Sequence, residues 1–326
     1  MSLNGKSILI TGGTGSFGRS MINSILRDFK PKRLVVYSRD ELKQFDMMKR
    51  IKKDSSIRFF IGDVRDYSRL VRALSKIDIV IHAAALKQVV SSEYNPIECI
   101  KTNINGAENV INAAIDTDVK KVIALSTDKA VNPINLYGAS KLCSDKLFIA
   151  ANNLSGRNGP VFSVVRYGNV LGSRGSVLDI FKESSKKGYF NVTHKNMTRF
   201  FITVDNAVKF VCKSLDLMKG GEIFIPKIPS VKIVDLARAI CSKSKINFIG
   251  IRPGEKLHEL MIPSDESSST LEFKDFYILQ SSILKSKSII YNKKKGEPVD
   301  LEFSYSSENN PEWLNIGKIR KIIKTI

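Results

Sequence analysis

The sequence predicts an α/β protein with a doubly wound parallel sheet and a smaller α/β substrate-binding lobe. Short apolar runs at residues 7–11, 33–37, 58–61 and 78–81 alternate with stretches of helical periodicity, as in parallel sheets with crossover helices. A glycine-rich turn follows the first run directly, and polar side chains gather after a fifth run at residues 121–125. A chain of 326 residues is long enough to bury the core of such a fold.

The alternation of strand and helix becomes less regular after a sixth apolar run at residues 161–166. We therefore expect a dinucleotide-binding domain at residues 1–168, completed by a returning segment at about 201–228. Residues 169–200 and 229–326 are expected to form the smaller lobe, which binds the substrate. The chain has no internal repeat and no long low-complexity linker.

The composition is that of an ordinary globular protein, with 43% hydrophobic and 26% charged residues. Its apolar runs are shorter than the ~18 residues that a membrane helix needs, so no membrane span is expected. The amino terminus enters a strand without the features of a secretory signal, which favours a cytoplasmic location. The four cysteines lack Cys-x-x-Cys spacing and the three histidines do not cluster, so we expect no metal site.

The formal net charge of +20, from 52 basic and 32 acidic residues, suits an anionic partner. The lysines are spread along the chain, and no basic motif interleaved with aromatic residues accompanies them. We expect a small anionic substrate and no nucleic acid. Nucleic-acid binding stays an alternative, for which salt-dependent binding to random DNA would be the test.

Residues 11–18 form a glycine-rich loop between the first strand and an amphipathic helix. Gly12 permits a tight turn, Gly15 lets the backbone approach a pyrophosphate, and Gly18 allows close packing of the helix. The amino terminus of the helix offers N–H groups to the anion. This is the pattern of a Rossmann-type dinucleotide site, whose expected contacts here are Gly12, Thr14, Gly15, Ser16, Phe17 and Gly18.

The second strand ends in Ser38 and Arg39, where an NAD-binding fold would place an acidic residue on the ribose 2′-hydroxyl. A guanidinium and a hydroxyl suit a 2′-phosphate, and Lys43, one turn into the next helix, adds a second cation. We therefore expect NADP. Alternatively, Arg39 is a solvated residue at the strand end and Asp40 caps the next helix, which would leave NAD open.

The ends of the later strands complete the expected cofactor site. Asp63 is placed to accept a hydrogen bond from the adenine amino group, and small residues after the fourth strand let the dinucleotide lie against the strand end. The contacts expected from these segments are Asp63, Val64, Ala83, Ala84, Ala85 and Tyr167. His82 is expected to be a packed residue rather than a catalyst.

Residues 126–141 bring a hydroxyl, an acid, two amines and a phenol into sixteen positions. The apolar run at 121–125 predicts a buried strand, so Thr127, Asp128 and Lys129 lie at its carboxyl end. Open α/β sheets place their chemistry there. The sequence therefore predicts an active site in this stretch.

Tyr137 and Lys141 lie one turn apart in a stretch of helical periodicity, residues 136–151. They share one face of the helix, so the ammonium is expected to lower the pKa of the phenol and stabilise a phenolate. A Tyr-x-x-x-Lys pair alone is weak evidence, because chance produces it often. The glycine loop upstream makes the interpretation much stronger.

Two later segments carry arginines in expected loops, at residues 197–201 and 251–258. Arg199 and Arg252 present planar, bidentate donors that suit the diphosphate of a nucleotide. Either one could equally be a structural ion-pair residue.

Taken together, the motifs resemble the extended short-chain dehydrogenase/reductases that act on nucleotide sugars. Nearly the whole chain is similar to the inverting UDP-N-acetylglucosamine 4,6-dehydratases. The segments that carry the similarity are 11–18, 38–41, 85–89, 128–129, 137–141, 166–170, 197–200 and 252–256. Tyr137 and the late segments 221–227 and 304–310 resemble the soluble members that open pseudaminic acid synthesis.

The resemblance implies tightly held NADP, a UDP-N-acetylglucosamine substrate and a homo-oligomer, from dimer to hexamer. It implies that Thr127, Tyr137 and Lys141 serve oxidation, and that Asp128 and Lys129 serve dehydration. The substrate contacts it implies are Lys87, Asn169, Arg174, Arg199, Lys227, Arg252 and Glu255.

Within this hypothesis, burial and neighbouring positive charges lower the pKa of Lys129, which then removes the C5 proton as a general base. Asp128, held protonated, donates to the departing C6 hydroxyl. Besides nucleic-acid binding, two alternatives to the dehydratase hypothesis stay open, one an enzyme and one a binding module. A nucleotide-sugar 4-epimerase would need Tyr137 and Lys141 only, and a non-catalytic NADP-sensing module would need only the glycine loop.

Overall fold

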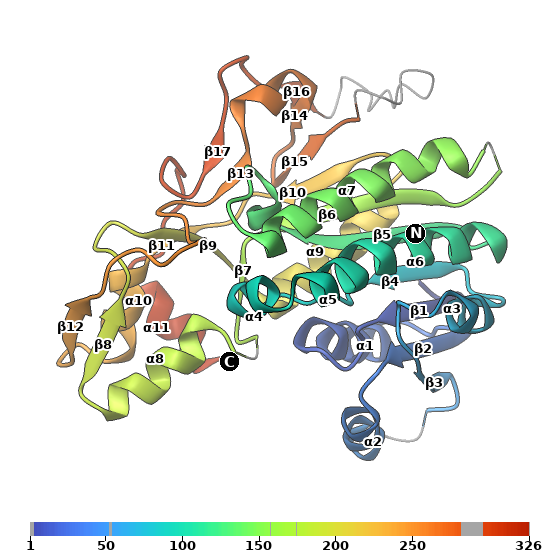
Figure 1. Cartoon of the computed structure of the whole chain (residues 1–326), viewed down its shortest axis with the longest axis horizontal. Helices are drawn as coiled ribbons and strands as arrows, with labels where there is room; N and C mark the ends of the chain where they lie inside the picture. Colours follow the sequence, from blue (N-terminus) through green and yellow to red (C-terminus); the bar gives the residue numbers. More distant parts are fainter. Residues whose placement is uncertain (1–2, 52–53, 157, 174, 282–295, 326) are drawn as a thin grey trace.

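The computed structural model describes residues 3–51, 54–156, 158–173, 175–281 and 296–325. Its main feature is a ten-stranded sheet with the strand order β16-β14-β15-β10-β6-β5-β4-β1-β2-β3 (Figure 1). The seven strands from β10 to β3 run parallel to their neighbours. These parallel strands are β1 (Ser7–Thr11), β2 (Arg33–Ser38), β3 (Ile57–Ile61), β4 (Ile79–His82), β5 (Lys121–Thr127), β6 (Val161–Tyr167) and β10 (Ile223–Pro226).

The parallel strands are doubly wound, as the sequence predicts. From β1 the chain proceeds outward through β2 and β3, and it then returns to β4 on the other side of β1. The strand order therefore reverses between β1 and β4, and open α/β sheets bind their ligands at such a switch point.

Helices cover both faces of the sheet (Figure 1). On one face α3, α6 and α7 pack in a row, and on the other α1 packs against α9. The helices of this domain are α1 (Ser16–Asp28), α2 (Glu41–Arg50), α3 (Tyr67–Leu74), α4 (Val89–Tyr94), α5 (Pro96–Ile100), α6 (Gly106–Asp116), α7 (Leu136–Leu154) and α9 (Val204–Leu217). Burial on both faces explains why the strands appear as continuous apolar runs rather than alternating ones.

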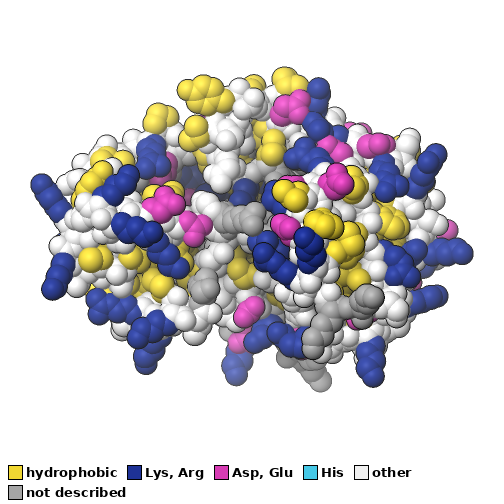
Figure 2. All heavy atoms as spheres, turned by 90° about the horizontal axis from the view of Figure 1, so that it is seen from below, with side chains coloured by type: hydrophobic (Ala, Val, Ile, Leu, Met, Phe, Trp, Pro, Cys, Tyr) yellow, Lys and Arg dark blue, Asp and Glu magenta, His cyan; other side chains and the backbone are white. Residues whose placement is uncertain are grey.

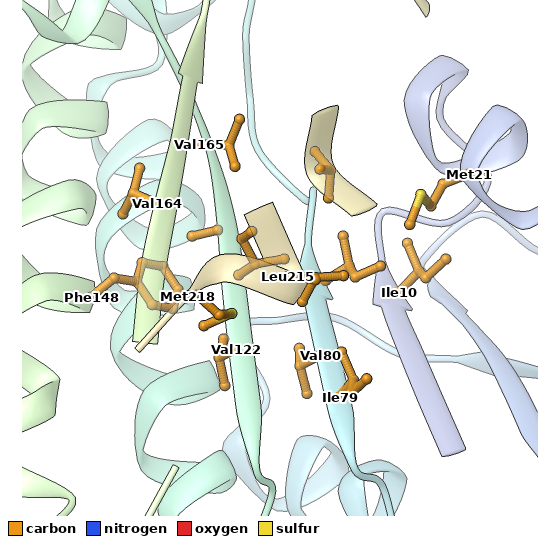
Figure 3. Close-up of a cluster of buried hydrophobic side chains, with 14 of the residues drawn as sticks. Ile10, Met21, Ile79, Val80, Val122, Phe148, Val164, Val165, Leu215 and Met218 are labelled. Carbon is orange, nitrogen blue, oxygen red and sulfur yellow. The ribbon is translucent and has the colours of Figure 1, made fainter. Parts of the chain in front are cut away.

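The main core lies between the sheet and these helices. Figure 3 shows side chains from neighbouring strands, among them Val80 of β4, Val122 of β5 and Val164 of β6, with Phe148 of α7 beside them. All four side chains are fully buried.

A smaller lobe has its own buried core, with Phe181, Phe190, Val231 and Leu236 among its members. It contains a three-stranded sheet, β11-β9-β7, and a two-stranded sheet, β12-β8. Its elements are β7 (Asn169–Leu171), α8 (Val177–Lys186), β8 (Tyr189–Val192), β9 (Thr198–Thr203), β11 (Ser230–Lys232), α10 (Ile233–Ile240), β12 (Lys245–Phe248) and α11 (Ile316–Lys324).

The structure differs from the expected domain boundaries at residues 260–306, which the sequence assigned to the smaller lobe. There β14 (Thr270–Glu272), β15 (Phe276–Leu279) and β16 (Glu297–Pro298) extend the large sheet, with β15 antiparallel to β10. A short pair, β13 (Leu260–Ile262) and β17 (Tyr305–Ser306), also contributes to the main core. These additions cover the edge of β10, which would otherwise expose unpaired backbone groups.

Basic side chains are distributed over the surface. Figure 2 shows lysines and arginines spread over the face it presents and interspersed with acidic residues. In the described parts of the chain, no helix has the length and hydropathy to cross a membrane. The four cysteines, all of which are described, are free.

Candidate active site

A cavity of about 660 Å³ lies along the carboxyl ends of the parallel strands, between the large sheet and the smaller lobe. Every residue that the sequence predicts for the cofactor site lines it, from Gly12 in the glycine loop to Tyr167 at the end of β6. The cavity is also lined by Thr127, Lys129 and Asn169. The structure thus brings the predicted cofactor residues together with most of the predicted catalytic ones.

The glycine loop has the geometry that a dinucleotide requires. Gly12 adopts φ +65°, and a Cβ atom there would lie 2.9 Å from the carbonyl oxygen of Ala83. A Cβ atom on Gly18 would lie 2.6 Å from the carbonyl oxygen of Gly12, so α1 could not pack this closely. The N-cap residue of α1 is Gly15, which brings no side chain to compete with an anion for the amide groups. The loop therefore fits the pyrophosphate of a dinucleotide.

The end of β1 is tied to the end of β4. The Oγ1 atom of Thr11 accepts hydrogen bonds from the amides of Ala83 (3.1 Å) and Ala84 (3.2 Å) and lies 2.9 Å from Nδ1 of His82. Burial lowers the pKa of His82 to about 3, and the charge of Lys141 acts in the same direction. His82 is therefore a neutral, packed residue, as expected, and it helps to align the two strand ends.

The structure shows features of both interpretations of the end of β2. Arg39 lines the cavity with half of its side chain exposed, and its Nη1 lies 3.5 Å from Oδ2 of Asp63. Asp40 caps α2 by accepting a hydrogen bond from the amide of Lys43 at 2.9 Å. Burial opposes ionisation of Asp63, but hydrogen bonds from Arg65 lower its pKa below the ordinary range. This end of the cavity is therefore lined by the two cations Arg39 and Lys43, each paired with a carboxylate.

Thr127 is the last residue of strand β5 and lines the cavity. A short 3-10 turn, η2 (Asp128–Ala130), follows directly. The hydroxyl of Thr127 donates to Oδ1 of Asp128 at 2.9 Å. The side chain of Asp128 is completely buried, and burial raises its pKa although Lys129 opposes the shift. The shift in the pKa of Asp128 is thus in the direction that the hypothesis requires.

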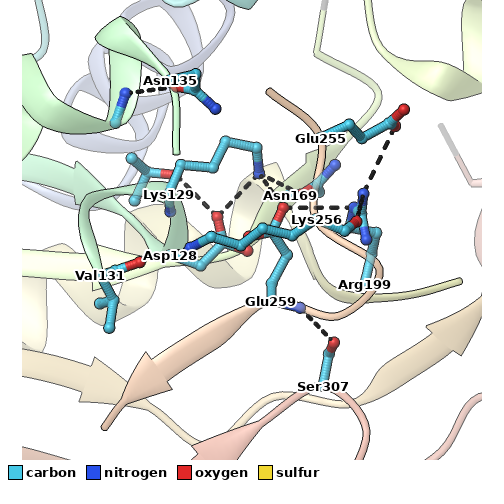
Figure 4. Close-up of polar contacts among 12 residues, drawn as sticks. Asp128, Lys129, Val131, Asn135, Asn169, Arg199, Glu255, Lys256, Glu259 and Ser307 are labelled. Atoms are coloured by element: carbon cyan, nitrogen blue, oxygen red, sulfur yellow. Dashed lines mark hydrogen bonds and ion pairs between the residues drawn. The ribbon is translucent and has the colours of Figure 1, made fainter. Parts of the chain in front are cut away.

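The ammonium of Lys129 is surrounded by oxygen atoms (Figure 4). Its Nζ lies 3.0 Å from Oδ1 of Asp128, 3.3 Å from Oδ1 of Asn169 and 3.3 Å from Oε1 of Glu259. Burial lowers the pKa of Lys129, but the two carboxylates outweigh burial and raise the pKa above its ordinary value. The expected lowering of this pKa is therefore wrong for the structure, because the expectation considered the neighbouring cations and did not include Glu259.

Tyr137 and Lys141 lie near the amino terminus of α7 and line the same cavity. Burial raises the pKa of Tyr137 to about 12, while the charge of Lys129 and a hydrogen bond with Thr127 oppose the rise. The expected lowering is thus reversed in this structure. Burial lowers the pKa of Lys141, and Asp145, one turn further along α7, opposes that shift.

Gly138 allows α7 to begin directly against the loop that carries Lys129. A Cβ atom at this position would lie 2.2 Å from the carbonyl oxygen of Lys129. The helix is capped by Asn135, whose Oδ1 accepts a hydrogen bond from the amide of Gly138 at 2.8 Å. Any larger residue at position 138 would therefore force the start of α7 away from the backbone of Lys129.

Arg199 and Glu259 form an ion pair beside Lys129. The Nε atom of Arg199 lies 3.5 Å from Oε1 of Glu259, and both side chains are almost fully buried. The Arg199 guanidinium also donates to the carbonyl groups of Thr198, Lys256 and Leu257. These contacts favour the structural ion-pair interpretation of Arg199, which is not among the residues that line the cavity.

The other expected substrate residues lie in different places. Lys87 and Asn169 line the cavity, and Glu255 lies 3.6 Å from Arg199. Arg252 is exposed and does not line the cavity. Lys227 forms an ion pair with Glu272 at 2.6 Å and lies over the ring of Tyr277, also outside the cavity. Arg174 lies outside the described residues.

Glu259 was missed by the sequence analysis, whereas Asn103 was expected to face inward in a pattern more often structural than catalytic. Glu259 directly follows the segment at 251–258, but nothing in its spacing indicates that it turns inward. Asn103 lies in a π-helical turn, η1 (Lys101–Asn105), between α5 and α6. Its side chain bonds both backbone groups of Leu86 (2.8 and 2.9 Å) and the hydroxyl of Ser140 (2.9 Å), joining the loop after β4 to α7. A π-turn often marks a functional position, but its sequence looks like ordinary helix.

A model of the polysaccharide biosynthesis protein family matches residues 8–281. The chain belongs to this family. Within it, the chain is 54% identical to a UDP-N-acetylglucosamine 4,6-dehydratase (inverting) from Campylobacter jejuni, over 98% of both chains. It is 39% identical to a UDP-glucose 4-epimerase from Rickettsia canadensis, over 98% of this chain and 96% of the relative. The X-ray structure of Pen from Bacillus thuringiensis is similar with a TM-score of 0.91 and 36% identity, covering 100% of this chain and 98% of the other.

The similarity to the dehydratase confirms the resemblance that the motifs indicated. The names of these family members nevertheless divide between a 4,6-dehydratase and a 4-epimerase. The choice between the two activities depends on what the site can do besides oxidise a sugar carbon.

Proposed function

We propose that the protein is a UDP-N-acetylglucosamine 4,6-dehydratase that inverts C5. The product would be UDP-2-acetamido-2,6-dideoxy-β-L-arabino-hexos-4-ulose, and the enzyme would be a lyase. The observation that carries the proposal is the acid–base pair of Asp128 and Lys129, whose side chains are joined at 3.0 Å. Lys129 lines the cavity together with Tyr137, and the fully buried Asp128 lies beside Lys129, outside the cavity lining. The similarity to an inverting dehydratase over nearly the whole chain supports it.

We propose NADP as the cofactor, held by the glycine loop, by the alanines after β4 and by Arg39 with Ser38 and Lys43 at the ribose end. The chemistry that bound NADP supplies is hydride transfer, out of C4 and later into C6, so that the overall reaction is redox-neutral. The guanidinium of Arg39 is half-exposed at the cavity rim, where it suits a 2′-phosphate.

In the first step Tyr137 takes the proton from the sugar O4. In this structure burial raises the pKa of Tyr137 to about 12, so an activated phenol depends on positive charge in the filled site. The charge of Lys129 and a hydrogen bond with Thr127 oppose the rise in the pKa of Tyr137, and Lys141, buried one helical turn away, is placed to add positive charge. The resulting ketone at C4 makes the C5 proton acidic.

In the second step Lys129 takes the proton from C5 and Asp128 gives a proton to the C6 hydroxyl, which leaves as water. In an ordinary ion pair Lys129 would be an ammonium and Asp128 a carboxylate. This step instead needs Lys129 as a neutral amine and Asp128 as a neutral carboxylic acid. A proton transfer across their 3.0 Å hydrogen bond produces both states at once. Burial favours the neutral acid because it raises the pKa of Asp128. The neutral amine is opposed by Asp128 and Glu259, which raise the pKa of Lys129, so the transfer depends on Asp128 taking up the proton. Return of a proton to C5 from the opposite face gives the inverted configuration.

A UDP-sugar 4-epimerase is the second candidate, because a relative carries that name and because Tyr137 and Lys141 would suffice for oxidation at C4. Epimerisation has no use for a buried acid–base pair next to the phenol. Mass spectrometry of UDP-N-acetylglucosamine incubated with the purified protein separates the two. Loss of one water from the sugar supports the dehydratase, and a product of unchanged mass would replace it with the epimerase.

We further propose that the enzyme works in the cytoplasm as a homo-oligomer and catalyses the first step in the synthesis of a pseudaminic acid-type sugar. These proposals follow from the resemblance of its motifs to the soluble dehydratases of that route. Light scattering of the purified protein tests the oligomeric state, and a monomer at working concentration would contradict it.

A further inference from the structure

Glu259 is a buried carboxylate that the reaction as written does not use. It lies immediately before β13, and only 3% of the residue is exposed. Its Oε1 lies between two cations, 3.3 Å from Nζ of Lys129 and 3.5 Å from Nε of Arg199. Its Oε2 is buried and has no hydrogen-bond partner among the described residues. A carboxylate that is this completely removed from water needs a reason to be there.

The backbone holds Glu259 firmly in place. The amide of Glu259 donates to Oγ of Ser307 at 2.9 Å, and that hydroxyl lies 2.7 Å from Oγ1 of Thr198 on β9. Arg199, the next residue on β9, bonds the carbonyl groups of Lys256 and Leu257 in the segment that leads to Glu259. The carboxylate is therefore fixed relative to the smaller lobe.

The three oxygen atoms around Lys129 match the three hydrogens of an ammonium. Asp128, Asn169 and Glu259 each provide one acceptor at 3.0 to 3.3 Å. A neutral amine has only two hydrogens, so this cage complements Lys129 after it has taken a proton better than before. In catalysis, groups that are complementary to the charge that develops lower the barrier.

We propose that Glu259 is a positioning residue that holds the amine of Lys129 over the cavity floor and stabilises the ammonium that forms when Lys129 takes a proton. The proposal rests on the proposed function for its catalytic consequence, but the interaction with Lys129 can be measured without substrate. Because Arg199 remains beside it, Glu259 keeps its negative charge and does not itself become the proton acceptor.

The other charged groups around Lys129 show what Glu259 contributes. Asp128 faces Lys129 from η2, Arg199 from β9, Lys256 from the segment before β13 and Tyr137 from α7. Burial opposes ionisation of Glu259, but Lys129, Arg199 and Lys256 outweigh it and lower the pKa of Glu259. Without Glu259, Lys129 would meet the cations Arg199 and Lys256 with Asp128 as its remaining carboxylate. Removal of the Glu259 charge should therefore make Lys129 a weaker base.

The direct test measures the pKa of Lys129 by competitive acetylation of the full-length protein at a series of pH values, followed by peptide mass spectrometry. We expect Glu259→Gln to lower the apparent pKa of Lys129 by about one to three units, the size of the effect of one nearby opposite charge. Glu266→Gln is the matched control, because Glu266 pairs with another buried arginine, Arg166, at 3.3 Å. An apparent pKa that is the same in the wild type and in Glu259→Gln would overturn the proposal.

The kinetic test follows dehydration of UDP-N-acetylglucosamine against pH. In Glu259→Gln, the limb of the pH–rate profile that reports ionisation of Lys129 should move to lower pH. The maximal rate should fall by about tenfold, which is less than the ~10²–10⁴-fold loss expected when a general base is removed. Glu259→Asp keeps the charge and should restore most of the limb position. A lower rate with an unmoved limb would reduce Glu259 to a structural role.

The two tests separate the inference from the proposed function. If the wild type does not dehydrate this substrate, the proposed function fails, while acetylation still decides whether Glu259 acts on Lys129. If Glu259→Gln does not fold, Glu259→Ala is compared with the wild type by acetylation. It should then show the lower pKa of Lys129 expected for loss of the charge, and an unshifted pKa in that variant would contradict the inference.

Discussion

The Nζ atom of Lys129 lies 3.0 Å from Oδ1 of Asp128, its neighbour in the chain. Adjacent residues rarely direct both side chains to one point, and here the short turn η2 after β5 makes it possible. One proton shared by this pair can produce a general base and a general acid together. The predictions below test this account and the site around it.

Asp128→Asn keeps the shape of the side chain but removes the acid. We expect the dehydration rate to fall by about 10²–10⁴-fold, because the C6 hydroxyl would leave without a proton donor. Oxidation at C4 should persist, but exchange at C5 should slow as well, because the amide cannot accept the proton that Lys129 must lose to become a base. Substrate recovered from heavy water should therefore contain little deuterium, and full exchange at C5 would mean that Lys129 becomes a free amine without Asp128.

Tyr137→Phe should leave the dinucleotide bound and lower the rate by about 10²-fold or more, because it removes the phenol that takes the O4 proton. Since the pKa of Tyr137 is raised to about 12, the wild-type rate should increase with pH across the neutral range if this phenol limits the reaction. Steady-state rates and the absorbance of bound cofactor check both statements. A variant that stays active would assign the proton transfer to another residue.

Arg39→Ala should weaken NADP binding by about 10- to 100-fold and leave NAD binding nearly unchanged, since a charge-assisted hydrogen bond contributes about 1.5–3 kcal/mol. Calorimetric titration of the cofactor-free protein with both dinucleotides measures the ratio. Arg58→Ala is a suitable control, because Arg58 bonds carbonyl groups of Ser55 and Ile57 on the outside of β3. Equal losses for NADP and NAD would indicate that Arg39 does not contact a 2′-phosphate.

His82→Asn tests the linkage of stability to pH. The pKa of His82 is lowered to about 3, so between pH ~6.5 and ~3 the unfolded chain binds a proton that the folded chain does not. Stability is therefore lost as the pH falls through this window, by about 1.4 kcal/mol per pH unit from this residue. Urea unfolding at several pH values should show a shallower loss in the variant. Parallel curves for the two proteins would contradict the buried, neutral state of His82.

Much of the fold could be predicted from sequence because the parallel strands other than the edge strand β3 are almost fully buried and therefore appear as apolar runs. The glycine loop was predictable for a similar reason, since the close approach of Gly12 and Gly18 to backbone atoms excludes side chains. The segment at 260–306 was assigned incorrectly because its antiparallel strands are short, and their pairing with β10 depends on contacts distant in sequence.

The charges of the site could not be predicted in the same way. The residues around Lys129 come from η2, β7, β9 and the segment before β13, so their summed effect on its pKa appears only when the chain is folded. Sequence placed Lys129 beside the phenol and beside cations. It could not indicate that Glu259 lies 3.3 Å away, and this carboxylate helps to reverse the direction of the pKa shift.

The central claim is that Lys129 removes the C5 proton during an inverting loss of water. The most direct measurement is NMR of the product formed from UDP-N-acetylglucosamine in heavy water without added cofactor, for the wild type and for Lys129→Ala. The account predicts a 4-keto-6-deoxy sugar with deuterium at C5 and inverted configuration from the wild type, and no dehydration by a variant that still binds the dinucleotide. A product that retains the C5 configuration, or dehydration by Lys129→Ala at the wild-type rate, would contradict it.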